Sequence, residues 1–207
     1  MLDDGSKQNL LNNLSLDIER CVKCELSCSR TFAVPGSGAT SSTLMFVGEA
    51  PGHNEDISGE PFVGSAGKLL TSLLNEIQMS RESVYITNIV KCRPPNNRDP
   101  HPNEITLCEP YLDAQISIVD PVLILPLGRF AMNYFIPGES ITRISGTVQK
   151  IQGRYVYPLL HPAAALRRTE YKQRLRNDFL NIPSAVDRIS LLSEGMDFGS
   201  FDQMRLT

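Results

Sequence analysis

The chain has 207 residues, of which 41% are hydrophobic and 21% are charged, and its formal net charge is −3. This length suits one globular domain, which we place at residues 1–190, followed by a weakly ordered tail at 191–207. No apolar run approaches the roughly 18 residues of a membrane span. The polar start, Met-Leu-Asp-Asp, is unlike a secretory signal. We therefore expect a soluble cytoplasmic protein with no membrane partner.

Predicted strands and helices alternate along the chain. Residues 1–15 are expected to begin a helix, and four apolar, β-branched runs predict strands with amphipathic segments between them. In chain order these are a strand at 43–47, a helix at 66–78, a strand at 84–90, a helix at 104–119, a strand at 122–127, a short helix after Gly128, a strand at 155–160 and a helical segment through 172–176. Such alternation implies an α/β fold with a parallel sheet covered on both faces.

Each predicted strand ends in polar, glycine or proline residues. The endings are 48–52, 87–88, 127–128 and 161–162. Ligands of open parallel sheets bind outside the carboxyl ends of the strands. We therefore expect the four endings to converge on one rim that forms the functional site.

The charge is unevenly distributed, because 143–176 holds eight basic residues and a single acid, Glu170. Phosphate binding depends on local clusters rather than on net charge, so this stretch could contact DNA. On charge alone, a solvated helix face is the alternative.

The cysteines have the spacing of a metal centre. Cys21 and Cys24 form a C-x2-C pair, Cys92 and Cys108 form a C-x15-C pair, and Cys28 is left over. Four thiolates suit either zinc or an iron–sulfur cluster, and the spacing alone does not separate the two. A redox C-x2-C pair normally follows a strand, and none is predicted before Cys21.

Four motifs carry a family resemblance. They are Gly48-Glu49-Ala50-Pro51-Gly52 with Glu55 and Asp56 shortly after, Gly59-x-Pro61-Phe62-Val63-Gly64-x-Ala66-Gly67, Tyr85-Ile86-Thr87-Asn88-Ile89-Val90-Lys91-Cys92-Arg93-Pro94-Pro95, and His161-Pro162-Ala163. Over residues 21–176 the chain resembles the family 4 uracil-DNA glycosylases. The resemblance implies a three-layer α/β/α sandwich on a four-stranded parallel sheet. It also implies one 4Fe–4S cluster, held by Cys21, Cys24, Cys92 and Cys108.

A neighbouring branch, the cross-linking uracil-binding proteins, shares the first motif. That branch carries a basic insert ending in a reactive histidine, and this chain lacks the insert. Its only histidine in that interval is His101, which lies between two prolines. We therefore expect a turnover enzyme rather than a covalent trap.

The resemblance implies a role for each rim residue. His161 would donate to the uracil O2, Asn88 would read the base edge, and Phe62 would stack on the flipped base. Glu49, Ala50 and Pro51 would complete the uracil-binding loop. Glu49, Glu55 and Asn97 are the candidates for orienting water or stabilising the sugar. Neither Lys68 nor Lys91 is marked as a Schiff-base nucleophile, so we expect a monofunctional enzyme.

The expected partner is uracil-containing DNA, single- or double-stranded. The segment after the His-Pro motif would contact it, with Ala163, Ala164, Ala165 and Leu166 as a wedge and Arg167 and Arg168 on phosphates. We expect a monomer, and the sequence has no convincing pattern for a sliding-clamp partner. The competing hypotheses are a non-catalytic iron–sulfur module that binds DNA or uracil, and a small redox protein.

Overall fold

The computed structural model describes residues 2–193 and contains one sheet of six strands, in the order β1-β3-β2-β4-β6-β5. The strands are β1 (Ser37–Gly38), β2 (Leu44–Gly48), β3 (Tyr85–Asn88), β4 (Leu123–Pro126), β5 (Gln149–Ile151) and β6 (Arg154–Val156). The helices are α1 (Asp4–Glu19), α2 (Leu26–Ser29), α3 (His53–Ser58), α4 (Ser65–Glu76), α5 (Pro102–Val119), α6 (Gly128–Phe135), α7 (Ile141–Ile144), α8 (Pro162–Ala165), α9 (Thr169–Leu180) and α10 (Ile182–Ser193). Two 3₁₀ turns, η1 (Arg81–Ser83) and η2 (Pro95–Asn97), complete the fold.

The four predicted strands are confirmed as the parallel centre of the sheet, β3-β2-β4-β6. Two further strands, β1 and β5, which the sequence did not predict, pair antiparallel at the two edges of this parallel sheet. These edge strands are too short to produce an alternating pattern. β5 turns into β6 through Gln152 and Gly153, whose φ angles are 49° and 84°. Two positive φ values are typical of a two-residue hairpin turn.

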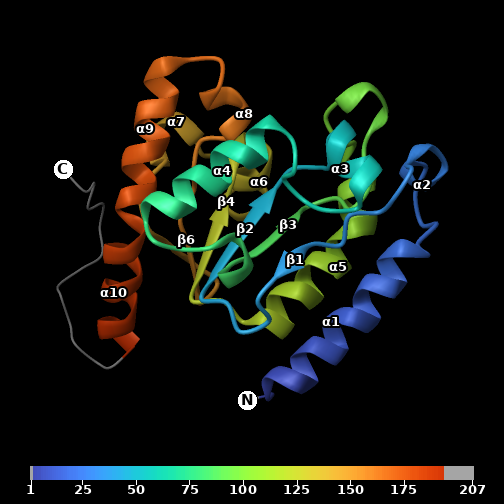
Figure 1. Cartoon of the computed structure of the whole chain (residues 1–207), viewed down its shortest axis with the longest axis horizontal. Helices are drawn as coiled ribbons and strands as arrows, with labels where there is room; N and C mark the ends of the chain where they lie inside the picture. The colour runs from blue at the N-terminus through green and yellow to red at the C-terminus, as the bar shows by residue number, and fades with distance from the viewer. Residues whose placement is uncertain (1, 194–207) are drawn as a thin grey trace.

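The sheet is the middle of three layers (Figure 1). Along β2, Leu44 and Phe46 face the core shared with α4, α9 and α10, where Phe46 stacks on Phe179 with ring centroids 5.7 Å apart. Met45 and Val47 face the opposite core, shared with α1 and α5. Successive strand side chains point to opposite faces, so a strand buried on both sides reads as a continuous apolar run.

The position of β2 determines where the site lies. β2 pairs with β3 on one side and β4 on the other, and the register sets Gly48 opposite Asn88. α4, which follows β2, packs on one face, whereas α5, which follows β3, packs on the other. Connections that diverge to opposite faces leave a crevice at the strand ends between them. The predicted rim is therefore at the carboxyl end of β2.

The predicted helices at 66–78 and 104–119 and after Gly128 correspond to α4, α5 and α6. The helix expected to begin in residues 1–15 is α1, and the segment through 172–176 belongs to α9. The domain boundary at residue 190 stays a prediction, and most of the predicted tail, 194–207, lies outside the described residues. Among the residues described, no helix is long and apolar enough to cross a membrane.

Candidate active site

The ends of β2 and β3 meet at a site that has no room for another side-chain carbon. A Cβ atom added to Gly48 would lie 2.2 Å from Asn88 Oδ1 and 2.7 Å from Phe62 Cζ. Glycine at position 48 therefore allows the amide of Asn88 and the ring of Phe62 to approach the same point of the backbone. We call Gly48, Phe62, Asn88 and His161 the strand-end site.

Asn88 contributes an unpaired acceptor to this site. The residue is 1% exposed, and its Oδ1 is the one buried side-chain nitrogen or oxygen in the described chain with no hydrogen-bond partner. Buried polar atoms are almost always paired, so such an exception calls for an explanation. The amide oxygen is available to accept a hydrogen bond from a ligand that enters beside Phe62.

Phe62 is held by contacts that the sequence does not reveal. Its φ angle is 53°, an uncommon value for an aromatic residue. Arg81 Nη1 donates to the carbonyl of Phe62 at 3.0 Å, and Arg81 Nη2 donates to the carbonyl of Pro61. Gly67 packs against the same peptide, because a Cβ there would lie 1.7 Å from the Phe62 carbonyl oxygen. Arg81 could not be identified from the sequence, because hydrogen bonds from a side chain to backbone carbonyls leave no sequence motif.

His161 lies beside Phe62, with ring centroids 5.9 Å apart. Burial lowers the pKa of His161 to about 4, against the opposing charge of Glu55, so the imidazole is neutral at pH 7. Its Nδ1 accepts a hydrogen bond from the backbone N–H of Ala163 at 3.1 Å. That bond assigns the proton of the neutral ring to Nε2, which makes His161 a hydrogen-bond donor at this atom.

Glu49 is the first residue after β2 and is half-buried. Burial, and then the charge of Asp99, raise its pKa to about 7, whereas Arg129 acts in the opposite direction. Its neighbours in the loop are Ala50, which is half-buried, and Pro51, which is buried. A carboxyl group that titrates near neutral pH can accept a proton from water.

Glu55 and Asn97, the other two candidates, are already engaged. Glu55 Oε1 accepts from the backbone N–H groups of Val63 and Gly64, both at 2.9 Å, and Oε2 accepts from Gly52 N–H at 3.1 Å. This carboxylate joins the start of α3 to the segment after Phe62. Asn97 is exposed, and its Oδ1 accepts from the Arg93 side chain at 2.8 Å. Both contacts indicate roles in arranging loops.

The predicted DNA-contacting residues differ in exposure. Ala163 and Ala164 are half-buried, Leu166, Arg167 and Arg168 are exposed, and Ala165 is only 2% exposed. Ala165 packs in the core under α8, so its side chain does not fit the expected wedge. Leu166, which is 47% exposed, is the apolar side chain that projects from this segment.

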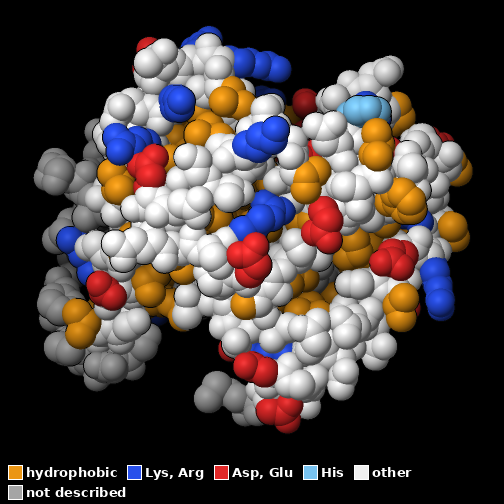
Figure 2. Space-filling model, in the orientation of Figure 1, with side chains coloured by type: hydrophobic (Ala, Val, Ile, Leu, Met, Phe, Trp, Pro, Cys, Tyr) orange, Lys and Arg blue, Asp and Glu red, His pale blue; other side chains and the backbone are white. Residues whose placement is uncertain are grey.

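Fewer basic side chains of residues 143–176 are available to bind phosphates than the composition of this stretch indicates. Lys and Arg side chains lie over the end of the molecule that carries α8 and α9 (Figure 2). Three of the eight pair with acids outside the stretch: Arg143 with Glu139, Arg154 with Asp120 and Arg176 with Glu76. Within residues 2–193, the side chains of Arg167 and Lys172 make no hydrogen bond or ion pair. These two cations are therefore available to phosphates.

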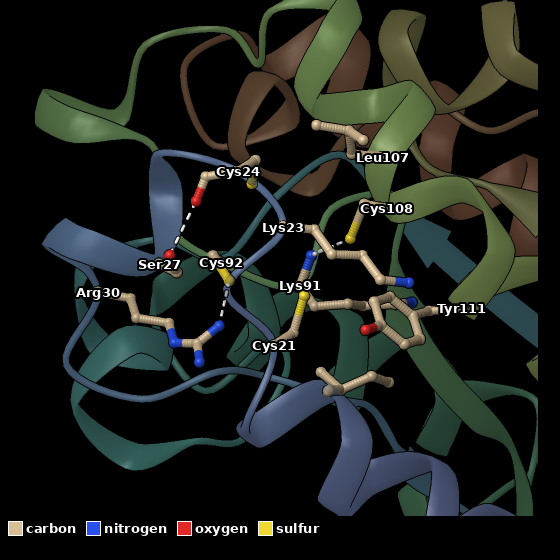
Figure 3. A pocket seen from close by; sticks show the side chains of 11 residues that line it. Cys21, Lys23, Cys24, Ser27, Arg30, Lys91, Cys92, Leu107, Cys108 and Tyr111 are labelled. Atoms are coloured by element: carbon tan, nitrogen blue, oxygen red, sulfur yellow. Dashed lines mark hydrogen bonds between the residues drawn. The ribbon is translucent and has the colours of Figure 1, made fainter.

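Four cysteines line a single pocket (Figure 3). Cys21 and Cys24 lie between α1 and α2, Cys92 follows β3, and Cys108 is in α5. Two N–H groups donate to the sulfurs: the guanidinium Nη1 of Arg30 to Cys92 Sγ at 2.9 Å, and the backbone N–H of Lys91 to Cys108 Sγ at 3.3 Å. Cys28 is exposed and does not line this pocket.

The donor set of this pocket is four cysteine sulfurs. Across residues 2–193, no group of three or more His, Cys, Asp or Glu side chains is arranged to hold a single metal ion. Four cysteine sulfurs around one pocket are the ligands that an iron–sulfur cluster requires. Cys21, Cys24, Cys92 and Cys108 could therefore hold such a cluster.

The fold and the strand-end site agree with the family comparison. The model of the Uracil DNA glycosylase superfamily matches residues 35–181, which is most of the chain. The chain therefore belongs to the uracil-DNA glycosylase superfamily. The matched segment starts after Cys21 and Cys24 and includes Cys92 and Cys108.

Several similar relatives are named type-4 uracil-DNA glycosylases. A type-4 uracil-DNA glycosylase of Saccharolobus solfataricus is 43% identical over 93% of this chain and 95% of its own length. That of Sulfurisphaera tokodaii is 49% identical over 83% of each chain, and that of Thermotoga maritima is 44% identical over 78% and 86%. The resemblance to family 4 predicted from the motifs is confirmed.

Proposed function

We propose that this protein removes uracil from DNA by hydrolysing the bond between uracil N1 and the sugar C1′, which leaves an abasic site. The relatives of similar length are named for this activity. The observation that carries the proposal is the buried, unpaired Oδ1 of Asn88 beside Gly48 and Phe62. An acceptor in that position suits a base with a donor on its pairing edge.

Recognition of the flipped base would use the amide of Asn88. Its Oδ1 would accept from uracil N3–H, and its Nδ2 would donate to uracil O4. Cytosine presents the opposite donors and acceptors at these two positions, so the same amide would reject it. Phe62 would stack on the base, and Ala50 and Pro51 would border it through the loop after β2.

Bond cleavage would use His161 and Glu49 on opposite sides of the bond. As the N1–C1′ bond breaks, negative charge develops on uracil, and the Nε2–H of neutral His161 would donate to O2. The sugar becomes cation-like, and ionised Glu49 would stabilise it and accept a proton from the water that adds to C1′. Glu55 and Asn97 would hold the surrounding loops. The amino group of Lys91 is buried and donates hydrogen bonds to three protein oxygens, so it is not placed to attack the sugar, which supports a monofunctional hydrolase.

Substrate contact would come from the segment after α8. We propose that Leu166 enters the space left by the flipped base, while Arg167 and Arg168 bind phosphates on single- or double-stranded DNA. A monomer inside the cell, close to its DNA, accords with this substrate. No feature of the described residues calls for a sliding-clamp partner.

The pocket of Cys21, Cys24, Cys92 and Cys108 would hold one 4Fe–4S cluster with a structural role. As its ligands, these cysteines would tie α5, the end of β3 and the segment after α1 together. Cys24→Ser should abolish the absorbance near 400 nm of anaerobically purified protein. Cys28→Ser is the matched control and should retain it. Equal loss of iron in both variants would contradict this ligand set.

The test of function is excision from a labelled single-stranded oligonucleotide that contains one uracil, followed by alkali. We expect cleavage that depends on both enzyme and alkali, and none of the matched cytosine strand. His161→Ala should slow excision at least a hundredfold with unchanged iron content. Binding of the strand without excision would instead support a non-catalytic module, and cleavage without alkali would contradict a monofunctional enzyme.

A further inference from the structure

Lys91 is a buried cation that the proposed hydrolysis does not use. The residue is 1% exposed, and its Nζ donates to three oxygens: Thr87 Oγ1 at 2.8 Å, Asn88 O at 2.6 Å and Gln115 Oε1 at 2.6 Å. Three acceptors match the three N–H donors of an ammonium group. Burial of a lysine is costly unless it is paired in this way. The arrangement therefore needs a reason beyond packing.

The acceptors around Lys91 are themselves fixed. Gln115 Nε2 donates to the carbonyl of Pro35 at 2.6 Å and contacts the hydroxyl of Tyr85 at 3.1 Å. The hydroxyl of Thr87 donates to the same Pro35 carbonyl at 2.8 Å. The ammonium is thus anchored to β3, α5 and the segment before β1. A fully satisfied buried network of this kind holds its members rigidly.

One member of the network is the main chain of the base-reading residue. The peptide after Asn88 is held at both ends, because its carbonyl accepts from Lys91 Nζ and its N–H, on Ile89, donates to Gly48 O at 2.9 Å. Because this peptide adjoins the Asn88 Cα, its two hydrogen bonds limit the movement of the atom that carries the side chain. Without the ammonium, the Asn88 carbonyl loses this hydrogen bond and the peptide is held less firmly.

Lys91 also contacts the cysteine pocket. Its backbone N–H donates to Cys108 Sγ at 3.3 Å, and the next residue is Cys92. Figure 3 draws Lys91 among the side chains that line this pocket, beside Cys108. A single residue therefore connects Cys108, in the cysteine pocket, with the main chain of Asn88.

We propose that Lys91 is a positioning residue for uracil recognition, which fixes the Asn88 amide through the Asn88 carbonyl and connects it to the cysteine pocket. This inference rests on the proposed function. It assigns Lys91 no contact with the substrate and no covalent step. Its effect on catalysis must therefore pass through Asn88, and a double-mutant cycle can detect that dependence.

The experiment compares Lys91→Met, Asn88→Ala and the double variant, with Lys23→Met as control. Lys23 lines the same pocket but is exposed, and its ammonium lies over the Tyr111 ring. We expect Lys91→Met to lower kcat/KM for the uracil strand at least tenfold in the wild-type background and less than threefold in the Asn88→Ala background. It should also weaken binding of free uracil, measured by calorimetry, whereas Lys23→Met should change neither.

Equal losses in the two backgrounds would overturn the inference, because they would indicate general damage. If Lys91→Met loses iron, Gln115→Leu decides by the same cycle, since it removes a partner of the ammonium and leaves every cysteine and Lys91 in place. Gln115→Leu must then depend on Asn88 as well, or the inference fails. An inactive wild-type protein would refute the proposed function instead, so the two failures are distinguishable.

Discussion

Glu49 and His161 have pKa values displaced in opposite directions by the same cause, burial. The pKa of the Glu49 carboxyl is raised to about 7, and the pKa of the His161 imidazole is lowered to about 4. Of these two groups, only Glu49 changes its charge near neutral pH. Two groups whose environments separate their pKa values in this way suit an acceptor and a donor in one reaction.

A pH profile tests this assignment. If excision needs ionised Glu49, kcat/KM should fall about tenfold for each pH unit below about 7 and level off above it. Glu49→Gln should be slow and flat over pH 5.5–8.5. A folded-state pKa above the ordinary value means that stability declines as pH rises from about 4.5 to about 7, so the variant should have the higher Tm at pH 8. An unchanged acid limb in Glu49→Gln would refute the role.

Gly48 offers a steric test at the same scale. In Gly48→Ala, the new methyl group would overlap Asn88 Oδ1 and the Phe62 ring, so one of them must move. We expect kcat/KM to fall at least a hundredfold, with a destabilisation of about 1–3 kcal/mol from overpacking. Gly5→Ala in α1 is the control, because its Cβ would meet only the Asp3 carboxylate at 3.3 Å. Wild-type activity in Gly48→Ala would show that the site is wider than described.

Among the elements, the junction of α3 with the segment after Phe62 depends on one side chain. Glu55→Gln replaces an acceptor that serves three backbone N–H groups with an amide that has a single acceptor oxygen. We expect a loss of about 1–3 kcal/mol in the free energy of unfolding and a raised KM, both from the loosened loop. Glu60→Gln, at an exposed acid of the same segment, should change neither. Equal thermal melts for the two variants would contradict this role.

The central elements were predictable, and their edges were not. The central strands β2, β3, β4 and β6 could be predicted because they are apolar runs. The edge strands β1 and β5 form only through hydrogen bonds to a neighbouring strand, which the sequence pattern does not show. The convergence of Asn88 and His161 followed from the rule that parallel strands end at one edge. The contacts of Arg81 and Lys91 with main-chain carbonyls have no sequence signature. The sequence also did not reveal that the Glu55 carboxylate accepts hydrogen bonds from three backbone N–H groups.

At the scale of the molecule, ion pairs leave fewer free cations in residues 143–176 than the sequence indicates, and this limits the salt dependence of DNA binding. Arg167→Ala should reduce the slope of log K against log salt concentration by about 1 on duplex DNA, through the loss of one phosphate contact. Arg154→Ala is the control, because Arg154 already pairs with Asp120. Fluorescence anisotropy between low and moderate salt measures both. Equal slopes for Arg167→Ala and wild type would exclude Arg167 from the interface.

The pairing of Gly48 with Asn88 in neighbouring strands also determines which changes of length the fold can absorb. Side chains alternate between the two faces of a strand, so one residue inserted within β3 would turn the amide of Asn88 to the opposite face. The connections that run over the surface, such as 137–140, carry no such constraint. In the evolution of this chain, insertions and deletions should therefore collect in the connecting loops. The number of residues from Tyr85 to Asn88 should stay constant, because it determines the face to which the Asn88 amide points.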